Sequence, residues 1–338
     1  MKHVSDQQVA DHLKRLNPWW QSGTMDAETL ALHPRAYLGP VRQLLQEARL
    51  RRAVVLLGPR RVGKTILIRH LIADLLKQGV LASRIAYVEM DHPLLHGQSL
   101  ETLIRQIEET APDGEGTRYL FFDEIQSHKD WEKHLKPLVD HRPDLKILVS
   151  GSAAAALKRQ STESGAGRFT DFLLPPLTFS EYLQLRQEPA AITEEEPGLY
   201  NLADIAQLNT QFSEYVNYGG YPELALSPTV RSNPERFVKS DIVDKVLLRD
   251  LPQLYGIKDI QELNALFTLL AFRTAFATQR RGQTDHSEVH RIPGGRVPHQ
   301  ARVPGGSGWK AISARTQLQG VSDQLGDVHR PVWCQVAG

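Results

Sequence analysis

Short apolar runs alternate with helical periodicity through the first half of the chain. Runs rich in β-branched and aromatic residues occur at 52–57, 85–90, 118–123, 146–150 and 172–174, and each has the length of a buried strand. The segment after the first run places Ile68, Leu71, Ile72 and Leu75 at helical spacing, and Ser99 is expected to cap another helix that begins at residue 100. This alternation predicts an α/β fold, with a parallel sheet flanked by helices.

The segments on either side of this pattern are predicted to be helical. Val9, Leu13 and Leu16 form a partial stripe that ends at Asn17-Pro18, and a second helix is expected at 41–50. The adjacent Trp19 and Trp20 suit packing of this segment onto the core better than covering a nucleotide base. Apolar stripes at 238–247 and 263–270 indicate a helical region after the sheet. We therefore expect a helical N-terminal arm (1–50), a sheet domain (51–180), a helical lid (181–272) and a tail (273–338).

The tail differs in composition from the rest of the chain. After about residue 273 the apolar periodicity ends, and Gly, Pro and Arg cluster around scattered single hydrophobic residues. Such a segment has no face to bury and is predicted to be disordered. A shifted reading frame and a genuine basic arm that meets nucleic acid or a partner both fit this pattern.

Length and composition describe an ordinary globular protein. The 338 residues are enough for about two domains, and 41% hydrophobic and 23% charged residues are typical values. The net charge of +1 gives no argument for nucleic acid or an anionic membrane as partner. The sequence has no signal-peptide core and no apolar run of about 20 residues, so it predicts no membrane attachment. Cys334 is the one cysteine, which excludes an internal disulfide and favours the reducing cytoplasm.

The first expected strand leads directly into a phosphate-binding sequence. Residues 58–65, GPRRVGKT, match G-x-x-x-x-G-K-[ST] without a mismatch, between a strand and a helix as the motif requires. Gly58 and Gly63 allow the backbone to wrap a phosphate. Lys64 is expected to contact the β and γ phosphates, and the Thr65 hydroxyl to bind Mg²⁺. The expected nucleotide-binding residues are Gly58, Pro59, Arg60, Arg61, Val62, Gly63, Lys64, Thr65 and Ile66.

Two acidic residues follow the third expected strand. P-loop NTPases present a carboxylate at such a strand end, so we expect Asp123 to hold Mg²⁺ and Glu124 to polarise the attacking water. Ser150, at the end of the next strand, is a candidate to contact the γ-phosphate, with Ser152 as the alternative or as a helix cap. Arg168 is a candidate to stabilise charge on the γ-phosphate, in its own subunit or in a neighbouring one.

The nucleotide is predicted to be ATP. GTPases recognise guanine through an Asn/Thr-Lys-x-Asp element, and the sequence contains none. The cofactors expected from the sequence are therefore ATP and Mg²⁺.

The combined motifs resemble those of bacterial and archaeal ATP-binding proteins of the AAA superfamily, near the archaeal-type and signal-transduction ATPases. The resemblance covers about residues 17–272 and is carried by GPRRVGKT, YLFFDEIQ, LVSGS, Gly167-Arg168, LLPPLTFSEYL, YVNYGGYPELAL and DKVLLRDLPQLYGI. It implies a sheet in the order 5-1-4-3-2 followed by a helical lid. It also implies that Tyr221 and Pro222, in Gly220-Tyr221-Pro222, contact adenine, although a simple turn fits this sequence equally well.

These observations predict a Mg-ATP-dependent ATPase in which hydrolysis drives or regulates a partner. A nucleotide-operated switch with slow turnover is the alternative, and so is a truncated ATP-binding protein that has lost its output domain. The sequence leaves open whether the partner is a protein or DNA, and whether the chain forms a homo-oligomer.

Overall fold

The chain forms two compact units, Met1–Leu177 and Thr178–Gly338. The computed structural model describes residues 5–284 except 48, 50, 113–115, 152–166, 189–191, 197–198 and 203–204. Ser152 and most of the predicted tail, from residue 285 onward, lie outside the described residues.

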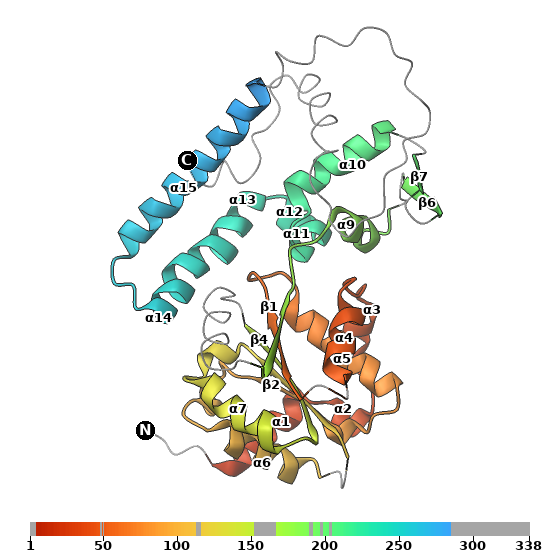
Figure 1. The fold of residues 1–338 in the computed structure, drawn as a ribbon, viewed down its shortest axis with the longest axis vertical. Helices are drawn as coiled ribbons and strands as arrows, with labels where there is room; N and C mark the ends of the chain where they lie inside the picture. The colour runs from red at the N-terminus through yellow and green to blue at the C-terminus, as the bar shows by residue number, and fades with distance from the viewer. Residues whose placement is uncertain are drawn as a thin grey trace. The chain divides into compact units, whose positions relative to one another are not determined.

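A five-stranded parallel sheet forms the centre of the first unit (Figure 1). Its order, β2-β3-β4-β1-β5, confirms the arrangement 5-1-4-3-2 that the resemblance implied. The strands are β1 (Ala53–Leu57), β2 (Ile85–Glu89), β3 (Arg118–Asp123), β4 (Leu145–Gly151) and β5 (Phe169–Leu173). Because all five run parallel, their carboxyl ends meet at one edge of the sheet.

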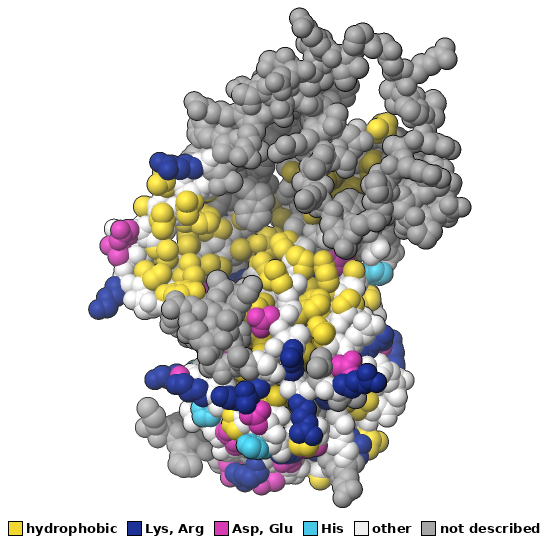
Figure 2. All heavy atoms as spheres, viewed as in Figure 1, with side chains coloured by type: hydrophobic (Ala, Val, Ile, Leu, Met, Phe, Trp, Pro, Cys, Tyr) yellow, Lys and Arg dark blue, Asp and Glu magenta, His cyan; other side chains and the backbone are white. Residues whose placement is uncertain are grey.

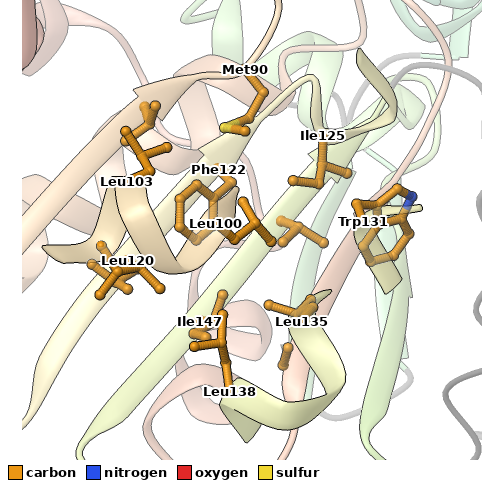
Figure 3. Close-up of a cluster of buried hydrophobic side chains, with 14 of the residues drawn as sticks. Met90, Leu100, Leu103, Leu120, Phe122, Ile125, Trp131, Leu135, Leu138 and Ile147 are labelled. Carbon is orange, nitrogen blue, oxygen red and sulfur yellow. The ribbon is translucent and has the colours of Figure 1, made fainter. Parts of the chain in front are cut away.

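Each face of the sheet carries its own hydrophobic cluster, because successive strand residues point to opposite faces. Val55 and Phe122 contribute to one cluster, and their neighbours Val54 and Phe121 to the other. The first cluster includes α1 (Asp6–Leu16), α6 (Leu100–Thr110) and α7 (Trp131–His141), and part of it is drawn in Figure 3. The second includes α4 (Leu38–Gln46) and α5 (Lys64–Lys77). The first unit is therefore a three-layer α/β/α domain.

Several predicted helix boundaries are confirmed. The side chain of Ser99 accepts a hydrogen bond from the backbone N–H of Thr102 and caps α6, and α1 ends at Leu16, just before Asn17-Pro18. Short helical turns complete the first unit: α2 (Trp19–Ser22), α3 (Ala27–Ala31), η1 (Ala82–Arg84), η2 (Pro93–Leu95) and η3 (Ile125–Ser127).

The N-terminal arm covers the outer edge of β2, the edge strand of the sheet. The side chain of Asn17 accepts a hydrogen bond from Tyr87 N (2.6 Å) and donates one to Tyr87 O (3.0 Å). The indole nitrogens of Trp19 and Trp20 both donate to Ile85 O, at 2.9 and 2.7 Å. The packing role expected for the two tryptophans is confirmed, and these three side chains satisfy backbone groups that an open edge would expose.

The second unit is mostly helical. A capping box at Thr178 begins α9 (Phe179–Leu185), and a two-stranded antiparallel sheet, β6 (Ile192–Glu196) with β7 (Leu199–Leu202), follows it. A separate cluster that includes Tyr221, Phe237 and Leu247 forms its core. The remaining helices are α10 (Ile205–Tyr218), α11 (Pro222–Leu226), α12 (Pro228–Arg231), α13 (Pro234–Arg236), η4 (Phe237–Val243), η5 (Val246–Asp250), α14 (Leu251–Tyr255) and α15 (Ile260–Thr284).

Helix α15 differs from the sequence-based boundary at residue 272. It continues to Thr284, past the residue where the apolar periodicity ends. Helical backbone bonds do not require an apolar stripe, so the end of the stripe and the end of the helix need not coincide.

Candidate functional site

A glycine loop joins the end of β1 to the first turn of α5. Gly63 caps α5 with φ 96°, and Arg61 also has a positive φ of 63°. A Cβ at Gly58 would lie 2.6 Å from the backbone oxygen of Leu174, a distance at which the backbone would have to move. Gly58 therefore allows the close approach of two backbone segments, and Gly63 the left-handed conformation that opens the helix.

The side chain of Lys64 folds back along this loop. Its Nζ donates to Gly58 O (3.1 Å) and Pro59 O (2.9 Å), and the residue is buried. The loop thus holds an ammonium group beside its own backbone. This ammonium and the N-terminus of α5 both favour a negatively charged ligand there.

Asp123, at the carboxyl end of β3, connects the loop to two neighbouring strands. Its Oδ2 accepts hydrogen bonds from Thr65 Oγ1 (2.6 Å) and Tyr87 Oη (2.9 Å). Its Oδ1 accepts from Ser150 Oγ and from the backbone N–H of Glu124 (3.2 Å). Three of the residues predicted from the sequence, Thr65, Asp123 and Ser150, therefore lie in direct contact.

Glu124 follows Asp123 in a left-handed backbone conformation, with φ 55° and ψ 42°. The next residue, Ile125, is buried in the core cluster drawn in Figure 3. Burial raises the pKa of the Glu124 carboxyl, and the nearby positive charge of Lys64 opposes the shift. The Gln126 side chain donates to Glu124 Oε2.

The donor set at Asp123 fits a hard divalent cation. Thr65 Oγ1 and the Asp123 carboxylate offer oxygen ligands, which Mg²⁺ prefers, and a P-loop site uses only one or two protein oxygens. Within the described ranges, no group of three or more His, Cys, Asp or Glu side chains is placed to hold a metal ion.

Arg168 lies at the amino ends of the strands, whereas the glycine loop lies at their carboxyl ends. It precedes β5, and its backbone oxygen accepts a hydrogen bond from Ala53 N at the start of β1. Since β1 ends at Leu57 and strands rise about 3.3 Å per residue, the length of a strand separates the Arg168 backbone from the loop. Its Nε donates to both carboxylate oxygens of Asp140 at 2.8 Å. The structure therefore does not bring Arg168 to the site of its own chain, and action on a neighbouring subunit stays a prediction.

The candidates for adenine contact belong to the second unit. Tyr221 is buried in the core of that unit, with its ring 6.3 Å from that of Phe237, and burial raises the pKa of its hydroxyl. Pro222 is the first residue of α11. Contact of either residue with adenine stays a prediction.

Two polar residues at the site were not identified from the sequence. Tyr87 lies inside the apolar run of β2, where an aromatic residue suggests only packing. No pattern in the sequence marks it: the β2–β3 register, in which Glu89 pairs with Asp123, places Tyr87 on the same face close to that carboxylate. Gln126 follows the two acids by a few positions, and only the turn at Glu124 brings its amide back to them.

The fold and this site define a nucleotide-binding P-loop domain. Residues 50–183 match the family model described as an AAA domain, which supports an AAA-type nucleotide-binding domain over these residues. Residues 209–299 match a second family model, described as a domain of unknown function (DUF8612), which extends beyond residue 272.

Two relatives each match 64% of this chain. An uncharacterized protein of Methanocaldococcus jannaschii is 26% identical over 216 residues, covering 64% of this chain and 45% of the relative. An uncharacterized protein of Haemophilus influenzae is 26% identical over 222 residues, covering 64% of this chain and 50% of the relative. The matched region thus spans about half the length of either relative.

Solved structures resemble the chain only distantly. The Saccharomyces cerevisiae Hsp104–ADP complex gives a TM-score of 0.41 at 15% identity, covering 73% of this chain and 36% of Hsp104. The Aeropyrum pernix ORC1 protein in complex with DNA gives 0.39 at 13% identity, covering 76% and 75% of the two chains. These likenesses are too weak to carry a functional argument.

Among the residues that the structure describes, no helix is long and apolar enough to cross a membrane.

Proposed function

We propose that the chain binds Mg-ATP at the glycine loop and hydrolyses it to drive or regulate a partner. The observation that carries the proposal is the 2.6 Å hydrogen bond between Thr65 Oγ1 and Asp123 Oδ2. These oxygens come from residues 58 positions apart in the sequence, and both are hard ligands beside a phosphate-binding loop.

The proposed chemistry is in-line attack of water on the γ-phosphate. The loop amides and the Lys64 ammonium hold the phosphates, while Thr65 and Asp123 provide oxygen ligands for the metal. Bound Mg²⁺ offsets negative charge on the phosphate oxygens. Glu124 orients the water as a general base, and Ser150, which hydrogen-bonds to Asp123, contacts the γ-phosphate.

A slowly hydrolysing nucleotide switch is the second candidate. Burial raises the pKa of the Glu124 carboxyl, and a carboxyl that carries a proton cannot accept one from water. A higher pKa of Glu124 slows hydrolysis without affecting the loop that binds phosphate. In such a switch, ATP binding itself changes the surface that a partner meets.

Two substitutions test these proposals. Lys64→Ala should abolish Mg-ATP uptake measured by calorimetry, because it removes the ammonium beside the loop. Glu124→Gln should retain uptake and lose phosphate release, since an amide cannot act as the base. Retained uptake by Lys64→Ala refutes the site. Normal uptake with negligible hydrolysis in the parent chain refutes the enzyme and leaves the switch.

The partner is proposed only by class. A protein or DNA stays open, and the face of the first unit drawn in Figure 2 intersperses basic with acidic side chains, which gives no argument for DNA. We also propose a cytoplasmic location without membrane attachment.

A homo-oligomer is proposed because Arg168 could contact a γ-phosphate only in a neighbouring subunit. Mixing an Arg168→Ala chain with a Lys64→Ala chain tests this, since intact sites form only across mixed interfaces.

A further inference from the structure

A buried arginine of the N-terminal arm reaches the phosphate-binding loop. Arg35 lies between α3 and α4, before the residues that match the AAA domain, and its relative exposure is 5%. Arginine is rarely buried to this extent unless its guanidinium has a fixed set of partners.

The guanidinium joins the glycine loop to the segment that follows β5. Its Nη1 donates to Val62 O at 2.7 Å, and its Nη2 donates to Pro175 O at 3.0 Å. Val62 belongs to the glycine loop, and Pro175 follows Leu174, whose backbone oxygen lies against Gly58. The planar fork of an arginine can hold two such carbonyl groups at once, whereas the ammonium of a lysine acts as a point donor.

Aromatic packing fixes the position of the fork. The Arg35 guanidinium carbon lies 5.5 Å from the centre of the Tyr37 ring, and that ring packs edge-on against Phe172 of β5 at 5.9 Å. The arginine is therefore held from the β5 side as well as by its own segment.

The bond to Val62 O also determines the direction of the next amide. In a planar trans peptide the C=O and the following N–H point in opposite directions. Holding Val62 O toward Arg35 therefore directs Gly63 N–H away from Arg35. Gly63 has no Cβ and adopts φ 96°, so its own conformational preference does little to prevent this peptide from rotating.

We propose that Arg35 is a positioning residue for nucleotide binding: it fixes the Val62–Gly63 peptide so that its N–H faces the phosphates. This inference rests on the proposed function, because it concerns the same loop. It makes the N-terminal arm part of the nucleotide site, although the arm supplies no group that contacts the nucleotide.

Calorimetric titration with Mg-ATP tests the inference on the full chain and four variants: Arg35→Ala, Arg35→Lys, Lys64→Ala and Arg42→Ala. Arg42 is the matched control, because it also anchors the arm, through a 2.8 Å ion pair with Asp74 of α5, without touching the loop. We expect Arg35→Ala to bind about tenfold more weakly, the effect of losing a hydrogen bond to a charged group. Arg35→Lys should fall between it and the parent, and Arg42→Ala should bind like the parent.

Chemical rescue separates positioning from general destabilisation. Millimolar guanidinium chloride should recover part of the affinity of Arg35→Ala, with no gain in the parent or in Arg42→Ala, and potassium chloride at equal ionic strength should have no such effect. A folded Arg35→Ala chain that binds like the parent overturns the inference, and so does an equal loss in Arg42→Ala. If Arg35→Ala does not fold, parental affinity in Arg35→Lys overturns it.

The same titrations distinguish failure of the inference from failure of the proposed function. No uptake by the parent, or uptake retained in Lys64→Ala, refutes the nucleotide site and the inference with it. Uptake that requires Lys64 but is unchanged in both Arg35 variants refutes the inference alone.

Discussion

Replacing Asn17 with Ala should destabilise the first unit strongly, because it removes buried hydrogen bonds to the edge strand β2. The Asn17 side chain is fully buried and makes three hydrogen bonds, to Tyr87 N (2.6 Å), Tyr87 O (3.0 Å) and Leu13 O (2.8 Å). The amide of Asn17 makes with the N–H and C=O of Tyr87 the two hydrogen bonds that a neighbouring strand would otherwise make. Alanine offers neither the donor nor the acceptor.

The magnitude follows from the backbone groups that lose this partner. A buried polar group left unsatisfied costs about 1–3 kcal/mol. The N–H and C=O of Tyr87 are two such groups, so the loss should be about 2–6 kcal/mol. Water that enters the space left by the amide would favour the lower half of this range. A total stability of about 5–15 kcal/mol is typical of folded proteins, so the change is large.

Amide hydrogen exchange is the appropriate assay, because a chain with two compact units need not unfold in one step. The Tyr87 amide should lose protection by at least about tenfold, and urea unfolding followed by tryptophan fluorescence should shift to lower concentration. Gln7→Ala is the control, since Gln7 makes an exposed side-chain bond to Asp11 on the same helix. A loss below about 1 kcal/mol in Asn17→Ala, or one no larger than in the control, refutes the reasoning.

Three further predictions concern the site itself. Tyr87→Phe removes a donor from Asp123, so Mg-ATP affinity should fall about 10–100-fold, while a calorimetric titration in EDTA should be unchanged; an equal loss without Mg²⁺ contradicts this. Gly58→Ala forces a Cβ to 2.6 Å from a backbone oxygen, so thermal melting should show a loss of about 1–3 kcal/mol, and an unchanged melting temperature would oppose it. Gln126→Leu removes a hydrogen bond that favours the ionised form of Glu124, which raises the pKa of that carboxyl further. The acidic limb of the pH–rate profile should therefore move to higher pH, and a shift to lower pH would show the sign to be wrong.

The features that the sequence predicted correctly have short-range causes. An apolar run followed by GPRRVGKT specifies strand, loop and helix locally, so the bounds of β1 and the start of α5 followed from the pattern. The order of the sheet came from resemblance. The start of β5 was missed: the expected run was 172–174, but the strand begins at Phe169. Because β5 is an edge strand with half-exposed residues, polar Thr170 and Asp171 interrupt its apolar signal.

The features that the sequence did not predict depend on contacts between distant residues. Asn17 reads as a helix stop before proline, and its second role exists only because β2 presents an open edge beside it. Arg35 lies in a short loop without periodicity, 27 positions from the carbonyl that it binds. Tyr87 was hidden inside an apolar run. In each case the polar atom acts through a partner that only the folded topology supplies, which single-sequence patterns cannot identify.

The arm therefore links the stability of the sheet to the order of the glycine loop. Asn17 anchors it to the edge strand, and Arg35 holds the carbonyl of Val62. Linkage makes such an arrangement reciprocal. If the contacts of Arg35 strengthen nucleotide binding about tenfold, bound nucleotide must strengthen those contacts by the same factor, about 1.4 kcal/mol. An event that loosens the arm must then weaken nucleotide binding, even when it touches no residue of the loop. This coupling follows from the geometry of the Arg35 guanidinium and requires no change in the shape of the sheet.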